Sequence, residues 1–172
     1  MNIENKRLDY DYYLKPATAL APDLLGKVLC RRLKDEIVRL RITETECYHG
    51  ESDTACHARR GLTPRTKVMY EQGGTVYIYL CYGIHNMLNV VAGSEGFPEA
   101  VLIRGIEGYS GPGRLTKFLD IDRDLNGIDL VKSDELWLED DGFHPDYIAT
   151  KRIGIDYAEP ADRDRLWRFV VV

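Results

Sequence analysis

The chain has 172 residues, of which 44% are hydrophobic, and a net charge of -5 at pH 7. This length predicts one globular domain over residues 1–172, and no apolar run approaches the roughly 20 residues that a membrane span needs. The negative charge argues against a protein that coats nucleic acid by bulk attraction. The first residues lack the apolar core of a secretory signal, so we expect a cytoplasmic protein without a membrane partner.

Charge is unevenly distributed along the chain. Residues 120–141 contain nine acidic and two basic residues, whereas residues 54–70 contain no acid. The basic residues in that second segment are Arg59, Arg60, Arg65 and Lys67. A basic segment of this kind either faces phosphate groups or is simply solvated, and the sequence leaves both readings open.

The first third of the chain predicts a helix and two strands. Residues 16–27 are typical of a short helix that ends at Gly26. Strands are expected over residues 27–32 and 37–48, with a polar turn between them. A second compact helix is expected over residues 63–74, with Thr63 as its N-cap, a proline at its first position and a Gly-Gly stop.

The rest of the chain is rich in predicted strands. Residues 75–93 favour two strands broken near Gly83, and residues 100–108 a third. Further elements are expected as a helix over residues 111–119 and as strands over residues 152–155 and 166–172. The predicted fold class is therefore α+β, with a mostly antiparallel sheet, short surrounding helices and a protruding β-hairpin.

The strand over residues 37–48 carries an unusual mixture of side chains. Alternation predicts that one face holds Val38, Leu40, Ile42, Glu44, Glu46 and Tyr48. A carboxylate at the end of an apolar row is partly desolvated, which raises its pKa and makes it a better base. The alternative is that both acids simply emerge into solvent where the strand leaves the core.

The hairpin over residues 75–93 is rich in tyrosine. Tyr77 and Tyr79 share a face, and Tyr82 stands just before Gly83, where the chain turns. Flat aromatic faces suit a planar ligand such as a nucleobase, and a projecting aromatic can act as a wedge in a DNA duplex. Tyrosines at this spacing are also common as half-buried sheet residues, so the pattern alone leaves both possibilities.

Six segments extend these observations: LLGKVLCRRL, TETECYHGESDTACHARRGLTPRTKVMY, GTVYIYLCYGIHNMLNVV, AVLIRGIEG, SGPGRLTKFL and RIGI. In order and spacing they resemble the alkyladenine (methylpurine, 3-methyladenine) DNA glycosylase family, over about residues 24–169. The resemblance implies a monomeric, cofactor-free and metal-independent enzyme of base excision repair. Its partner would be double-stranded DNA that contains a damaged purine. The enzyme would flip the alkylated or deaminated purine out of the duplex and hydrolyse its N-glycosidic bond.

The resemblance also implies roles for individual residues. Glu46 matches the carboxylate that activates water, and Arg104 the arginine that helps to hold the flipped nucleotide and its water. Tyr82 matches the intercalating residue of the hairpin. The residues expected around the flipped base are Tyr48, His57, Tyr79 and Asn89. Phosphate contacts are expected for Arg59, Arg65 and Lys117.

Two other functions compete with this one. A non-catalytic module that binds damaged DNA would use the tyrosines and the basic segment but would have no use for Glu46. A zinc site could draw on Cys47, His49, Cys56 and His57, but their spacing fits no usual ligand pattern, so we expect no metal. All four cysteines are expected to be reduced thiols.

Overall fold

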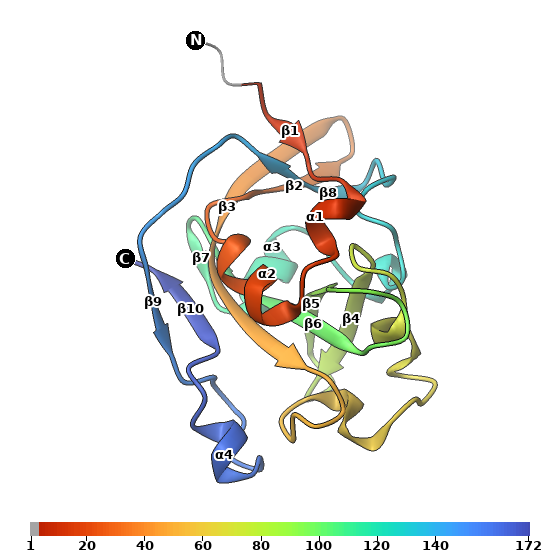
Figure 1. Cartoon of the computed structure of the whole chain (residues 1–172). Coiled ribbons are helices and arrows are strands. Elements are labelled where there is room, and N and C mark those ends of the chain that lie inside the picture. The colour runs from red at the N-terminus through yellow and green to blue at the C-terminus, as the bar shows by residue number, and fades with distance from the viewer. Residues whose placement is uncertain (1–3) are drawn as a thin grey trace.

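The structure is a computed structural model that describes residues 4–172 (Figure 1). Its strands are β1 (Lys6–Arg7), β2 (Val28–Leu33), β3 (Glu36–His49), β4 (Val76–Cys81), β5 (His85–Val91), β6 (Glu99–Ile106), β7 (Tyr109–Ser110), β8 (Leu136–Asp140), β9 (Tyr147–Thr150) and β10 (Arg168–Val171). Its α-helices are α1 (Tyr10–Tyr13), α2 (Ala17–Asp23), α3 (Pro112–Phe118) and α4 (Pro160–Arg163). Short 3₁₀ turns occur at His57–Arg60, Lys67–Tyr70 and Arg123–Leu125.

The described strands join into one sheet in which every pairing is antiparallel. The main path runs β1-β8-β2-β3-β6-β5-β4, while β10 pairs with β3 and carries β9 on its other side. Few and short helices accompany this sheet, and the β4–β5 hairpin ends in an exposed tip. The predicted fold class, α+β with a mostly antiparallel sheet, is confirmed.

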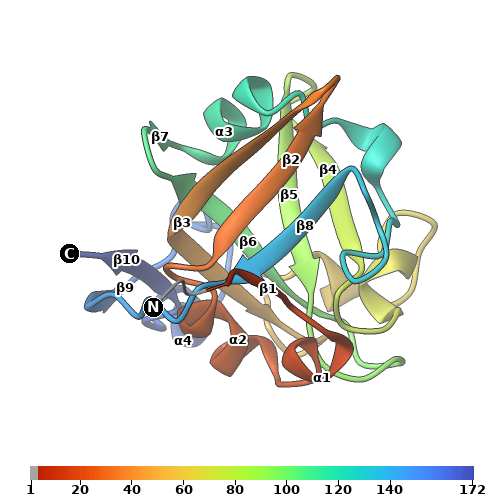
Figure 2. The ribbon, with the colours of Figure 1, turned by 90° about the horizontal axis from the view of Figure 1, so that it is seen from above.

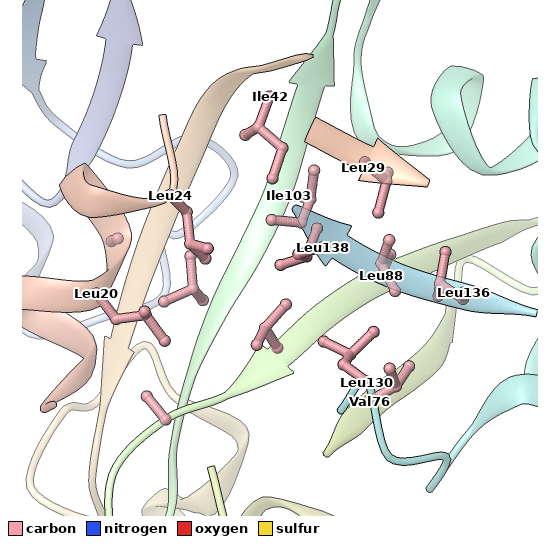
Figure 3. Close-up of a cluster of buried hydrophobic side chains, with 14 of the residues drawn as sticks. Leu20, Leu24, Leu29, Ile42, Val76, Leu88, Ile103, Leu130, Leu136 and Leu138 are labelled. Atoms are coloured by element: carbon pink, nitrogen blue, oxygen red, sulfur yellow. The ribbon is translucent and has the colours of Figure 1, made fainter. Parts of the chain in front are cut away.

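The sheet curves around one apolar core (Figure 2). Side chains of β2 and β8 meet those of β4, β5 and β6, although these strands belong to different halves of the strand order (Figure 3). Leu20 of α2 and the C-cap residue Leu24 cover another side of the same core. The opposite face of β4, β5 and β6 carries a smaller cluster that includes Tyr77, Met69 and Ala100, with Tyr48 and Tyr79 packed against it.

Strand β3 departs from simple alternation in its middle. Ile42 and Cys47 both belong to the main core although they are five positions apart, and the register against β6 shifts on either side of Glu44. An extra residue in a β-bulge reverses which side chains face the core. Gly105 allows the close approach, because a Cβ there would lie 2.9 Å from Oγ1 of Thr43. The prediction that the apolar and acidic residues of β3 share one face is therefore wrong.

The predicted helix over residues 63–74 is reduced to the single 3₁₀ turn Lys67–Tyr70. The predicted cap at Thr63 is present. Oγ1 of Thr63 accepts from the N–H of Thr66 at 3.2 Å, and the carbonyl of Thr63 accepts from the N–H of Lys67 at 2.9 Å. The element nevertheless ends after one turn at Tyr70. Gly73 serves close packing, because a Cβ there would collide with the carbonyl oxygen of Tyr13.

Residues 152–155 form an irregular segment and no strand, which corrects a second prediction. The backbone N–H of Ile153 donates to a side chain of β3, and the Arg152 side chain turns inward to buried acceptors. The remaining predicted elements are confirmed as α2, β2, β3, the β4–β5 hairpin, β6, α3 and β10. No helix within residues 4–172 is long and apolar enough to span a membrane.

Candidate active site

A cavity of about 650 Å³ opens beside the β4–β5 hairpin. Its volume lies within the range of small-molecule sites. Its walls come from β3, the hairpin, β6, the start of α3 and the segment 153–157. Most residues predicted for the site line it, namely Tyr48, His57, Arg65, Tyr79, Tyr82, Asn89 and Arg104. Strands distant in the chain thus bring these side chains to one place.

Glu46 lies directly behind the cavity wall and has no exposed surface. Its Oε2 accepts a hydrogen bond from the Tyr48 hydroxyl at 2.7 Å, and its Oε1 accepts one from the N–H of Ile153 at 2.9 Å. Nε of Arg104 is 3.3 Å from the same Oε1. All three partners line the cavity, so the acid lies immediately beneath the cavity wall.

The surroundings of Glu46 act on its pKa in opposite directions. Burial raises the pKa above 4.5, while the Arg104 guanidinium, the Ile153 N–H and the Tyr48 hydroxyl lower it. The net result is a raised pKa, because desolvation outweighs these favourable contacts. A buried carboxylate that is held by hydrogen bonds and has a raised pKa is suited to general base catalysis.

Aromatic rings form one wall of the cavity. The rings of His57 and Tyr79 have centroids 4.4 Å apart at an interplanar angle of 75°. Nδ1 of His57 and the Tyr77 hydroxyl are hydrogen-bonded at 3.0 Å. Burial, together with the charges of Arg65 and Arg59, lowers the pKa of His57 to about 4. The imidazole is therefore neutral at pH 7 and presents an uncharged ring.

The hairpin tip projects beside the cavity. Tyr82 is 90% exposed and has a φ of 52°, and Gly83 follows with a φ of 70°. The carbonyl of Cys81 accepts from the N–H of Ile84 at 3.1 Å, which closes the turn. Two consecutive positive φ values are typical of a tight hairpin turn, and a tyrosine seldom adopts them. The turn thus holds an aromatic side chain in solvent with a strained backbone.

Asn89 is buried at the cavity wall, on β5. Its Nδ2 donates to the backbone carbonyls of Tyr77 and Met87, each at 3.2 Å. Both amide hydrogens therefore have protein acceptors. Two hydrogen bonds therefore hold the side chain in place at the cavity wall.

The predicted phosphate-binding residues are placed differently from one another. Arg65 is exposed at the rim, with its guanidinium 5.3 Å from the centroid of the Tyr79 ring. Arg59 lines an adjoining cavity of about 420 Å³, to which Arg65 also contributes. Lys117 is exposed on α3 and lines neither cavity, whereas Arg114 of the same helix lines the main one.

Sequence reasoning missed the role of the segment 152–157. The side chains of Arg152 and Asp53 form a buried ion pair with a shortest distance of 2.7 Å, and Arg152 also donates to the carbonyl of Cys47 at 2.9 Å. The guanidinium lies 5.0 Å from the ring centroid of Tyr48. The sequence signal for this stretch is RIGI, one of the segments that resemble the family, although a strand is predicted there.

The residues of the zinc alternative do not gather. Cys47 belongs to the main core, whereas Cys56 belongs to the smaller cluster and His57 faces the tyrosines. Within residues 4–172 no three histidine, cysteine or acidic side chains are arranged to hold a metal ion. All four cysteines are free thiols.

Comparison with known proteins identifies the family of the chain. The family model described as Methylpurine-DNA glycosylase (MPG) matches residues 11–110 and 107–172. A protein of Psychrobacter cryohalolentis named "Putative 3-methyladenine DNA glycosylase" is 46% identical, over 92% of this chain and 89% of its own. Proteins of the same name from Methanocella arvoryzae and Borreliella burgdorferi are 45% and 43% identical, over 94% and 95% of this chain and 90% and 95% of their own. The chain therefore belongs to the methylpurine-DNA glycosylase family.

Proposed function

We propose that the chain is a monofunctional DNA glycosylase that removes alkylated or deaminated purines from duplex DNA by hydrolysis of the N-glycosidic bond. Family membership supports the reaction class. The observation that carries the proposal is the fully buried Glu46 behind an aromatic cavity. Burying a carboxylate is costly, and a module that only binds damaged DNA would gain nothing from it.

In this proposal Glu46 acts as a general base. Its two hydrogen bonds leave lone pairs free, because a carboxylate offers about four acceptor sites. A water held by Glu46 gives its proton to the carboxylate while its oxygen bonds to C1′ of the sugar. The bond from C1′ to the base nitrogen breaks, and the base leaves with the electron pair. The carboxylate also stabilises the positive charge that develops on the sugar.

The rest of the cavity holds the extruded purine. Tyr48, His57 and Tyr79 offer ring faces for stacking, and a neutral His57 adds no charge against an alkylated, cationic base. Tyr82 enters the duplex and replaces the stacking that the flipped base gives up. Arg59 and Arg65, at the edges of the two cavities, and Lys117, on the exposed side of α3, are proposed to contact phosphates of the duplex.

Asn89 is the proposed selectivity element. Its amide is fixed by two backbone carbonyls, so it fills its place at the cavity wall. A purine with a 2-amino group would collide with a side chain that has no room to move. We therefore propose that Asn89 disfavours normal guanine.

The direct test is a panel of duplex oligonucleotides, each with a single 3-methyladenine, 7-methylguanine, hypoxanthine or ethenoadenine. The purified chain is incubated with each duplex, and products are separated with and without alkaline treatment. A monofunctional glycosylase gives strand cleavage only after alkali. Cleavage without alkali would indicate a lyase, and no cleavage with tight lesion binding would indicate a binding module.

A further inference from the structure

One N–H of Arg104 lies between two acids of β3. Nε of Arg104 is 3.2 Å from Oε1 of Glu44 and 3.3 Å from Oε1 of Glu46. Only the contact with Glu44 has the geometry of a hydrogen bond. Nε carries a single hydrogen, and this hydrogen is donated to Glu44. Glu46 therefore interacts with the positive charge of the guanidinium but accepts no hydrogen bond from Nε.

A second arginine holds Glu44. Nε of Arg168, on β10, donates to the same Oε1 of Glu44 at 2.5 Å. Glu44 is 8% exposed and lies between β6 and β10, opposite Gly105 and Val170. The β-bulge turns Glu44 to the side of Arg104, since the register shifts on both sides of it. Two acids and two arginines thus form one compact, charge-balanced group.

In this arrangement the terminal nitrogens of Arg104 remain available to bind a ligand in the cavity. Arg104 lines the cavity, and within residues 4–172 its terminal nitrogens Nη1 and Nη2 have no hydrogen-bond acceptor. Without Glu44, the Nε–H of Arg104 would be free to donate to Glu46 and occupy one of its lone pairs. Glu44 prevents this because it accepts that N–H.

We propose that Glu44 is a positioning residue that accepts the Nε–H hydrogen bond of Arg104. Glu46 thereby keeps lone pairs for the attacking water. Arg104 is also held with its terminal nitrogens directed at the nucleotide. Arg168 keeps Glu44 in place for this purpose. The inference rests on the proposed role of Glu46. It goes beyond that role because it assigns a function to Glu44 and Arg168, neither of which lines the cavity.

The charged and titratable groups around Glu46 all influence its pKa. Those groups are Tyr48 and Glu44 on β3, Tyr79 on β4, Arg104 on β6, Arg152 in the segment after β9 and Arg168 on β10. Replacing Glu44 with glutamine removes a negative charge and frees two arginines. The pKa of Glu46 should then fall. Replacing Arg168 with glutamine leaves Glu44 uncompensated and draws Arg104 away, so the pKa of Glu46 should rise.

The experiment measures the pKa of Glu46 in the full chain by ¹³C NMR of labelled glutamate carboxyl groups. The Glu46 signal is assigned by its loss in Glu46→Gln. We expect a downward shift of about one pH unit in Glu44→Gln and an upward shift in Arg168→Gln. The acid limb of the pH profile of base release should move in the same two directions. Glu36→Gln, an exposed acid at the start of β3, is the matched control and should shift neither quantity.

Opposite shifts in the two variants support the inference, because a merely structural defect would not change sign. An unchanged pKa in Glu44→Gln, or shifts of both variants in one direction, would overturn it. Should Glu44→Gln fail to fold, an absent upward shift in Arg168→Gln would overturn it as well. The titration needs no substrate. If the wild-type chain released no base, the proposed function would be refuted. The pKa measurement would still test whether Glu44 positions Arg104.

Discussion

The hydroxyl of Tyr48 donates to Oε2 of Glu46 over 2.7 Å, and the two residues lie two positions apart on β3. Their side chains share one face of the strand, with the ring at the cavity and the acid behind it. In the proposed mechanism the same tyrosine would stack on the base and hold the carboxylate that acts on its sugar. This hydrogen bond would then couple base recognition to water activation.

Removing that hydroxyl should separate the two roles. In Tyr48→Phe the ring remains, but the ionised form of Glu46 loses a hydrogen bond, so its pKa should rise further. We expect base release at pH 6 to fall about tenfold, with lesion binding nearly unchanged. Single-turnover kinetics and gel-shift titration measure the two quantities. Tyr70→Phe, which removes a hydroxyl bonded to Glu51 away from the cavity, is the control, and an equal loss there would contradict the assignment.

Tyr82 should matter for DNA and not for stability. Its side chain is 90% exposed, so Tyr82→Ser should change the free energy of unfolding by no more than about 0.5 kcal/mol. Loss of stacking should weaken binding of a lesion-containing duplex by about tenfold or more. Tyr147→Ser, at an exposed aromatic of β9, should leave binding intact. Unchanged binding in Tyr82→Ser would refute the wedge role.

His57 should make the protein sensitive to acid. Its pKa is about 4 in the folded protein, against 6.5 for an ordinary histidine, so the unfolded chain binds the proton first. Stability should be complete above pH 6.5 and fall as the pH drops toward 4, by about 3 kcal/mol from this residue. Urea unfolding of wild type and His57→Gln at pH 7, 5.5 and 4 measures this. His144→Gln, at an exposed histidine, should follow wild type, and parallel curves for His57→Gln would contradict the prediction.

The ion pair between Arg152 and Asp53 should be essential to the fold around the site. Their side chains are 0% and 1% exposed, so Asp53→Ala leaves a buried, uncompensated charge. We expect a loss of about 3–5 kcal/mol in the free energy of unfolding. The double change Asp53→Leu with Arg152→Met should recover much of it, since it removes both charges. A loss below about 1 kcal/mol in Asp53→Ala would show that the pair is not needed.

Part of this architecture follows directly from the sequence. Alternation in β4 separates Val76 and Ile78, in the main core, from Tyr77 and Tyr79, at the cavity. The turn at Gly83 is also predictable from the sequence, because a glycine between two strand patterns indicates a hairpin. These local signals, together with the resemblance, predict most of the expected site residues that line the cavity.

Other parts depend on contacts between distant residues, which no local pattern contains. The bulge at Glu44 arises from its pairing with β6 on one side and β10 on the other. Strand β8 was missed because its residues lie in the acid-rich stretch 120–141. Ile153 donates its N–H to Glu46 across 107 positions, so periodicity alone could not reveal that residues 152–155 are held by a side chain and not by a strand.

We propose that Glu46 activates water for hydrolysis of the N-glycosidic bond. Glu46→Gln keeps the shape of the side chain but removes the base. Release of the damaged purine from a duplex and binding of the same duplex should be measured for this variant beside wild type. We expect release to fall by at least about 100-fold while binding stays within about threefold of wild type. Release at the wild-type rate would contradict the account.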